Sequence, residues 1–86
     1  MSRHTLKALL ATHTVVVGWD RPMGTFFGHV QDLTINEEDR DPIIVWLGGD
    51  FGEITSAATL IERIRPYAVI PDNLQATLEA EQVAHA

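Results

Sequence analysis

The chain has 86 residues, of which 45% are hydrophobic and 21% charged, with a formal net charge of −6 and no cysteine. This length allows one domain, residues 1–86, and the composition is that of a globular protein. The lack of cysteine excludes disulfides, zinc–thiolate sites and thiol nucleophiles. The acidic balance argues against direct nucleic-acid binding, which relies on Lys and Arg.

The first twelve residues carry a short apolar pattern. Leu6, Leu9 and Leu10 follow helical spacing, and Ser2 is a candidate N-cap. Because this pattern covers little more than one turn, we expect residues 1–12 to form either a short N-terminal helix or a flexible tail. The apolar run ALLA is too short for a secretory signal, which needs about 7–15 apolar residues, and no stretch approaches the roughly 20 needed to span a bilayer. The expected location is therefore the cytoplasm, without membrane contact.

Residues 13–20 and 25–33 are predicted to form a β-hairpin. Both segments are rich in β-branched and aromatic residues, and RPMG between them has turn chemistry. If Asp20 faces Thr25, one face of the hairpin is the better core face, and it carries Val15, Val17, Trp19, Phe26 and Val30. The other face is mixed, and it carries Thr14, Val16, Gly18, Asp20, Thr25, Phe27, His29 and Gln31. A slip of one residue would exchange the two faces.

The second half of the chain predicts one more strand and two helices. Residues 43–48 begin IIVWL, apolar throughout, so both faces of this strand are expected to be covered. Residues 55–65 carry an amphipathic helical pattern that Thr55 or Ser56 would cap. Residues 72–83 predict a second helix, in which Asp72 and Gln75 have capping-box spacing. YAVI (67–70) is either a short strand or an extended link, and residues 84–86 are expected to be flexible.

These elements define an α+β fold. It consists of a three-stranded antiparallel β-meander (13–20, 25–33, 43–48) followed by two α-helices (55–65, 72–83), with helices covering one face of the sheet.

Known catalytic and metal-binding patterns are missing. The turn GGDFGE lies between a strand and a helix but lacks the Lys-Ser/Thr ending of a phosphate-binding loop. The four histidines have no helical metal-pair spacing, and Ser56 is better explained as a helix cap than as a nucleophile. We therefore expect no enzyme activity, no cofactor and no metal, and we do not expect a small-molecule ligand.

The apolar residues outnumber those that two helices can cover. Val16 and Phe27 lie on the mixed face, and the third strand adds apolar residues to both faces, so part of the sheet needs further cover. One candidate is the N-terminal LKALL helix, and the other is a second copy or another protein; we expect a protein-binding surface on the sheet. The candidate partner-binding residues are Trp19, Arg21, Phe27, His29 and Trp46. The expected function is a small non-enzymatic protein-binding module, with self-association as one form.

Two other functions remain open from the sequence. One is an acidic regulator that mimics nucleic-acid charge and occupies a basic protein surface, with binding that weakens with salt. The other is ligand binding beside the Gly-rich turn, which a pocket flanked by Asp50, Arg21 and His29 would favour.

Overall fold

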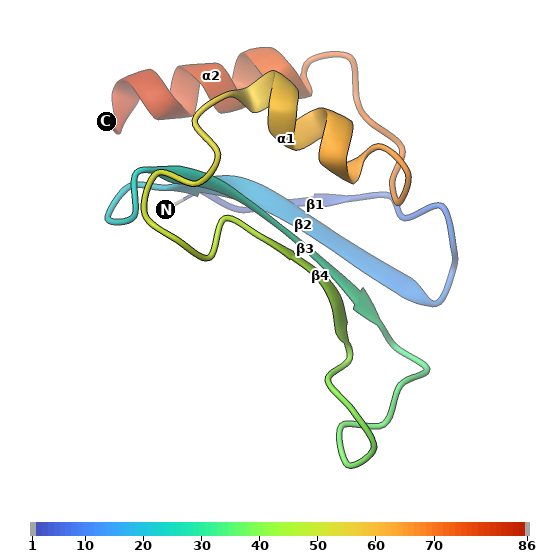
Figure 1. The fold of residues 1–86 in the computed structure, drawn as a ribbon. Coiled ribbons are helices and arrows are strands. Elements are labelled where there is room, and N and C mark those ends of the chain that lie inside the picture. The colour runs from blue at the N-terminus through green and yellow to red at the C-terminus, as the bar shows by residue number, and fades with distance from the viewer. Residues whose placement is uncertain (1, 86) are drawn as a thin grey trace.

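A four-stranded antiparallel sheet carries two helices on one of its faces in the computed structural model, which describes residues 2–85 (Figure 1). The strand order is β1-β2-β3-β4. The elements in chain order are β1 (His4–Leu6), β2 (His13–Asp20), β3 (Thr25–Asp32), β4 (Ile43–Leu47), α1 (Ala57–Ile64) and α2 (Leu74–Ala84). The predicted α+β class is confirmed, but the predicted meander lacks one strand.

The hairpin of β2 and β3 has the predicted register. Trp19 pairs with Phe26, Val17 with Gly28, and Val15 with Val30. The expected core face is correct as well, since all five of its side chains belong to the buried cluster beneath the helices. The short turn between the two strands places Asp20 opposite Thr25 and so fixes this register. A slip of one residue would bring the mixed face under the helices.

The N-terminal segment is a strand, and the predicted short helix is wrong. Thr5 pairs with Val16 at the edge of the sheet, and of the three leucines only Leu6 is buried, while Leu9 and Leu10 are each 56% exposed. Pairing with β2 therefore prevails over the weak helical pattern. The predicted flexible segments, 1–12 and 84–86, include residues 1 and 86, which lie outside the described part of the chain.

The predicted α1 cap is present, but the predicted α2 cap is not. Ser56 is the N-cap of α1, and its Oγ accepts a hydrogen bond from the backbone N–H of Thr59 at 3.4 Å. The N-cap of α2 is Asn73 without a side-chain hydrogen bond, so the capping box predicted at Asp72 is wrong. Between the helices, the YAVI segment is a link that contributes a single antiparallel bridge from Ala68 to Ala8.

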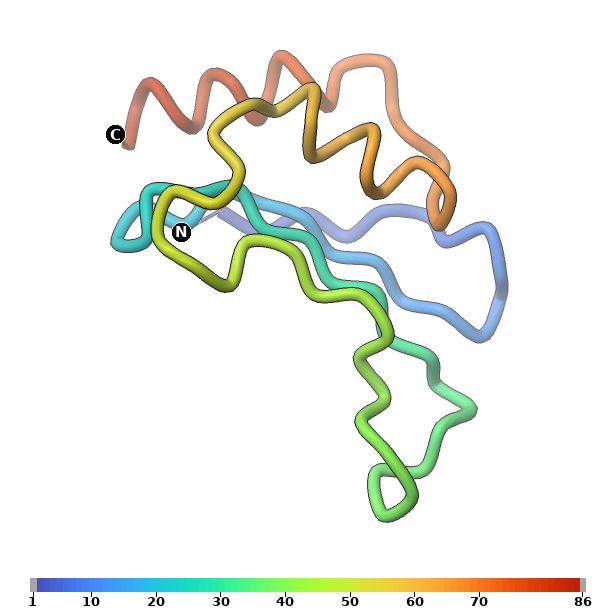
Figure 2. Tube along the Cα trace, in the orientation of Figure 1, coloured from blue at the N-terminus to red at the C-terminus, as the bar shows by residue number. Residues whose placement is uncertain are grey.

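Both helices lie over the inner face of the sheet, and the core lies between these two layers (Figure 1). Leu60 and Ile64 of α1 are fully buried and come close to Gly28, where an added Cβ would lie 2.9 Å from Ile64 Cδ1. The glycine therefore lets α1 approach β3. The chain trace shows that the connector between β3 and β4 extends away from both layers (Figure 2).

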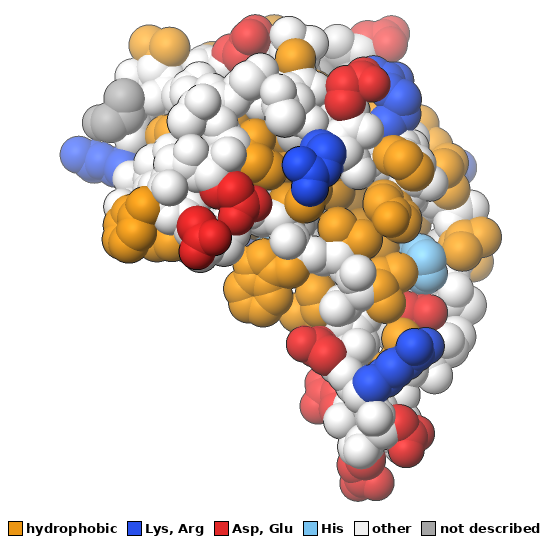
Figure 3. Space-filling view, viewed as in Figure 1, with side chains coloured by type: hydrophobic (Ala, Val, Ile, Leu, Met, Phe, Trp, Pro, Cys, Tyr) orange, Lys and Arg blue, Asp and Glu red, His pale blue; other side chains and the backbone are white. Residues whose placement is uncertain are grey.

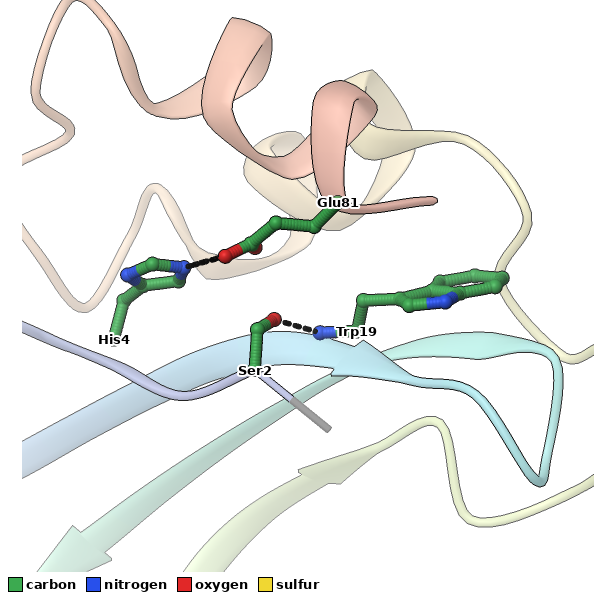
Figure 4. Close-up of polar contacts among 4 residues, drawn as sticks. All are labelled: Ser2, His4, Trp19 and Glu81. Atoms are coloured by element: carbon green, nitrogen blue, oxygen red, sulfur yellow. Dashed lines mark hydrogen bonds and ion pairs between the residues drawn. The ribbon is translucent and has the colours of Figure 1, made fainter. Parts of the chain in front are cut away.

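Polar contacts connect the N-terminal segment to β2 and α2 (Figure 4). His4 Nε2 lies 2.9 Å from the carboxylate of Glu81 on α2. Ser2 Oγ accepts a hydrogen bond from the backbone N–H of Trp19 at 2.8 Å, and the Trp19 indole N–H donates to the carbonyl oxygen of His85 at 3.3 Å. The two ends of the described chain are thus bound to the same end of β2.

Candidate functional site

The outer face of the sheet, which the helices leave uncovered, is built from cross-strand rows of side chains. One row runs from Thr5 through Val16 and His29 to Trp46, as the three strand registers give it. In the next row, Gly18 pairs with Phe27. Arg3 precedes His4, the partner of Val17, so it extends this second row at the β1 side.

Glycines flank Phe27 in its row. A Cβ on Gly18 would lie 2.7 Å from Phe27 Cζ, so the ring packs directly over that glycine. On the other side, Gly48 has φ +80 and its Cβ would lie 2.8 Å from the Cα of Phe27. Both positions need a residue without a side chain. The Phe27 ring is therefore closely packed between its neighbours and is only 5% exposed.

Aromatic rings follow one another across the outer face from β3 to β4. The ring centroids of Phe27 and His29 are 5.6 Å apart, and those of His29 and Trp46 are 4.9 Å apart, both in tilted arrangements. Trp46 ends this run with 61% of its surface exposed. Aromatic surface that lies open in this way is typical of binding positions, because it offers large contact area at a small cost in side-chain entropy.

A hollow of about 320 Å³ opens on this face. Its lining combines aromatic and apolar side chains with one positive and one negative side chain. The lining residues are Arg3, Asp20, Met23, Phe27, His29, Trp46, Gly48 and Gly49.

The surroundings of His29 favour the neutral form of its side chain. Its pKa is lowered from 6.5, first because partial burial disfavours the charged imidazolium and second because the positive charge of Arg3 lies close by. The side chain therefore offers the site a neutral ring, with one nitrogen that donates and one that accepts a hydrogen bond.

The structure brings together three of the five sequence-predicted site residues. Phe27, His29 and Trp46 share the outer face, whereas Trp19 is 4% exposed on the inner face beneath the helices. Arg21 is exposed in the turn between β2 and β3, away from the hollow lining. Phe27 is largely hidden by its neighbours, so Trp46 is the member that presents most surface.

Sequence reasoning missed the contribution of the N-terminal segment to this site. Arg3 lines the hollow because β1 pairs with β2, and no local sequence pattern predicts that pairing. Of the three residues expected to flank a pocket, only His29 lines the hollow; Asp50 and Arg21 do not.

The Gly-rich turn binds one of its own acidic side chains. The backbone N–H of Gly48 donates to the Glu53 carboxylate at 2.7 Å. A carboxylate thus satisfies the donor that a phosphate-binding loop would direct at its ligand. Within residues 2–85, no three His, Asp or Glu side chains come together as a metal site.

β4 forms one edge of the sheet and is apolar throughout. Ile44 and Trp46 are 42% and 61% exposed, against the expectation that both faces of this strand are covered. Edge strands of most proteins carry charges or proline that prevent pairing with another chain, and IIVWL has neither. Figure 3 shows hydrophobic side chains gathered beside β4 and acidic ones around the extended connector.

Comparison of the chain with protein-family models, with curated proteins and with solved structures finds no match. Among the described residues, neither helix has the length and apolar character that crossing a bilayer requires.

Proposed function

We propose that this chain is a non-enzymatic protein-association module that works as a homodimer through the β4 edge and the adjoining outer face. The observation that carries the proposal is the uncovered apolar edge strand, in which Ile44 and Trp46 face solvent. An edge strand presents unpaired backbone N–H and C=O groups, and a second strand satisfies them while covering the apolar side chains.

The β4 sequence suits pairing with a second copy of itself. In an antiparallel pair centred on Val45, Ile44 lies opposite Trp46 of the partner subunit, and Ile43 opposite Leu47 of the partner subunit. Each position thus meets an apolar residue on the same face, which is the arrangement that stabilises antiparallel strands. The symmetry is that of a two-fold dimer, in which one patch binds its own copy.

The other edge of the sheet is less suited to pairing. β1 has three residues, His4–Leu6, and lies between the charged side chains of Arg3 and Lys7. Short length and flanking charge are common protections of edge strands. The bridge between Ala8 and Ala68 occupies part of this edge as well. The proposal therefore assigns association to β4.

Analytical ultracentrifugation of the full chain over a range of concentrations tests the dimer. We expect a monomer–dimer equilibrium that the edge-blocking variant Trp46→Lys shifts to monomer. The matched control is Val83→Lys on α2, which adds the same charge at a site 81% exposed and should leave the equilibrium unchanged. A monomer at every concentration, or equal behaviour of both variants, contradicts the proposal.

A second function, binding to a basic protein surface, is favoured by one observation. Glu37, Glu38, Asp39 and Asp41 lie exposed on the connector that extends away from the sheet (Figures 1 and 3). A protruding cluster of one sign raises the rate of encounter with an opposite charge. This function predicts binding to a basic partner that charge-neutralising substitutions in 37–41 abolish and Trp46→Lys leaves intact.

A further inference from the structure

We propose that the hollow on the outer face binds a free aromatic α-amino acid. In this assignment the ring lies against Phe27, His29 and Trp46, the carboxylate meets the guanidinium of Arg3, and the ammonium group meets the carboxylate of Asp20. The inference goes beyond dimer formation, because it assigns a small ligand to the hollow beside β4, with Trp46 as the residue that the hollow and the β4 edge share.

The size of the hollow suits one amino acid. Its volume of about 320 Å³ lies at the lower end of the range of small-molecule sites, roughly 300–1,000 Å³. Gly48 and Gly49 form part of the lining and add no side chain to it. A single ring with a short charged backbone fits this volume, whereas the phosphate of a nucleotide would be repelled by Asp20 and by the net charge of −6.

The chemistry of the lining favours an aromatic side chain. The rings of Phe27, His29 and Trp46 follow one another with centroid separations of 5.6 and 4.9 Å. Met23 adds an apolar thioether to the same lining, and sulfur–aromatic contacts are favourable. Aromatic rings pack on such surfaces in offset or edge-to-face arrangements.

Two charged side chains in the lining are free to bind a ligand. Arg3 takes part in none of the side-chain hydrogen bonds or ion pairs among residues 2–85. Asp20 accepts one long hydrogen bond, from the backbone N–H of Met23 at 3.4 Å, and forms no ion pair in the same residues. A guanidinium and a carboxylate each form strong charge-assisted hydrogen bonds with a ligand group of opposite charge.

The pair of charges selects a zwitterion. A ligand with a carboxylate alone would bind Arg3 but would be repelled by Asp20 and by a chain of net charge −6. A ligand with an ammonium group alone would meet the opposite difficulty at Arg3. An α-amino acid carries both groups on one carbon, so it satisfies both side chains while its ring occupies the aromatic part of the hollow.

The test is a titration of the full chain with L-phenylalanine, followed by the indole N–H signal of Trp46 in ¹H–¹⁵N spectra. We expect a saturable shift of this signal, while that of the buried Trp19 stays nearly constant. Phenylacetate, phenethylamine and L-alanine each lack one ligand group, and we expect each to bind at least about ten-fold more weakly. Titrations at two protein concentrations separate ligand binding from self-association, so either can fail alone.

Substitutions with matched controls assign the two charges. Arg3→Gln and Asp20→Asn should each weaken L-phenylalanine binding about ten-fold, and Asn keeps the oxygen that accepts from Met23. Arg21→Gln and Asp50→Asn make the same changes at exposed sites outside the lining and should have no effect. Arg3→Lys keeps the positive charge and should retain most of the affinity for L-phenylalanine. Retained affinity in this variant would show that Arg3→Gln weakens binding through the lost charge and not through unfolding.

Several results would overturn the assignment. The first is the absence of a saturable shift up to about 10 mM L-phenylalanine, a concentration at which even weak binding is detected. The second is equal affinity for L-phenylalanine and phenylacetate. The third is equal weakening of L-phenylalanine binding by the control substitutions.

Discussion

Single glycines allow close packing on the outer face, and Gly18 is one of them. A Cβ at this position would lie 2.2 Å from the carbonyl oxygen of Ser2 and 2.7 Å from Phe27 Cζ. The first neighbour is backbone and the second is a ring held at 5% exposure, so neither gives way easily. The glycine thus serves both the pairing of β1 and the packing of Phe27.

We therefore predict that Gly18→Ala destabilises the fold by about 1–3 kcal/mol, the usual cost of overpacking. Urea denaturation followed by circular dichroism measures the change. Gly49→Ala is the control, because its Cβ would lie 3.2 Å from the side chain of the exposed Trp46, which has room to shift; its effect should stay within about 0.5 kcal/mol. Equal losses in the two variants would contradict this account of Gly18.

His29 gives the stability a pH dependence. Its pKa is lowered in the folded chain from 6.5 by burial and by Arg3, so below that pH the unfolded chain binds a proton that the folded chain does not. Stability is thus complete above the ordinary histidine pKa and declines as pH falls towards the lowered pKa. We expect thermal melts from about pH 8 to about pH 5 to show this decline, and His29→Gln to reduce it.

Asp32 provides an internal reference for that experiment. Its pKa is lowered from 3.8 mainly by the Thr34 hydroxyl, which donates to Oδ1 at 2.6 Å. Its contribution is therefore lost only as pH falls below about 4, in a separate window. An unchanged slope above pH 5 in His29→Gln would show that His29 does not cause the decline.

At the scale of elements, α1 supplies most of the cover for the inner sheet face. Leu60 is fully buried in the core cluster and lies beside Gly28 of β3. We predict that Leu60→Ala destabilises the fold by about 2–5 kcal/mol, through lost apolar burial and the cavity it leaves. Glu62→Ala on the exposed side removes only the ion pair with Arg65 and should cost less than about 0.5 kcal/mol, as urea titrations of both variants can measure.

Elements with strong local patterns could be predicted from the sequence, and β1 could not. The hairpin register follows from the short RPMG turn, which places Asp20 opposite Thr25 and depends on local residues alone. β1 instead depends on pairing with β2 across a loop, while Leu6 follows helical spacing with Leu9 and Leu10 beyond the strand. The sequence predicts the N-cap of α2 at Asp72, one residue before the observed N-cap Asn73. Asp and Asn have similar preferences for this position, so the pattern does not distinguish them.

The same distinction applies to the candidate site. Phe27 and His29 could be placed on one face from strand alternation, whereas the face of Trp46 stayed open because its strand is apolar throughout. The structure places the Trp46 ring 4.9 Å from that of His29. Arg3 lines the hollow because β1 pairs with β2, which is a non-local contact. Gly48 lines it at a position after β4 where the backbone has a positive φ. The exposure of Trp46 agrees with its expected place on a sheet face that the helices leave uncovered, whereas Phe27 is more buried than that expectation implied.

At the scale of the whole molecule, charge and apolar surface oppose each other in the proposed dimer. Each copy carries a net charge of −6, so two copies repel, whereas the paired β4 strands contribute apolar contacts and backbone hydrogen bonds that salt hardly affects. Raising the ionic strength from about 0.01 M to 0.1 M shortens the screening length from about 30 Å to about 10 Å. The repulsion is thereby reduced and the attraction retained.

We therefore predict that the dimer becomes tighter, by a few-fold in its dissociation constant, as salt is added over this range. Sedimentation at fixed protein concentration and increasing NaCl measures the change. Binding of the acidic connector to a basic protein would respond in the opposite direction, because the same screening weakens attraction between opposite charges. The sign of the salt dependence thus separates the two functions, and a dimer that dissociates on adding salt would show that charge pairs, and not β4, hold the copies together.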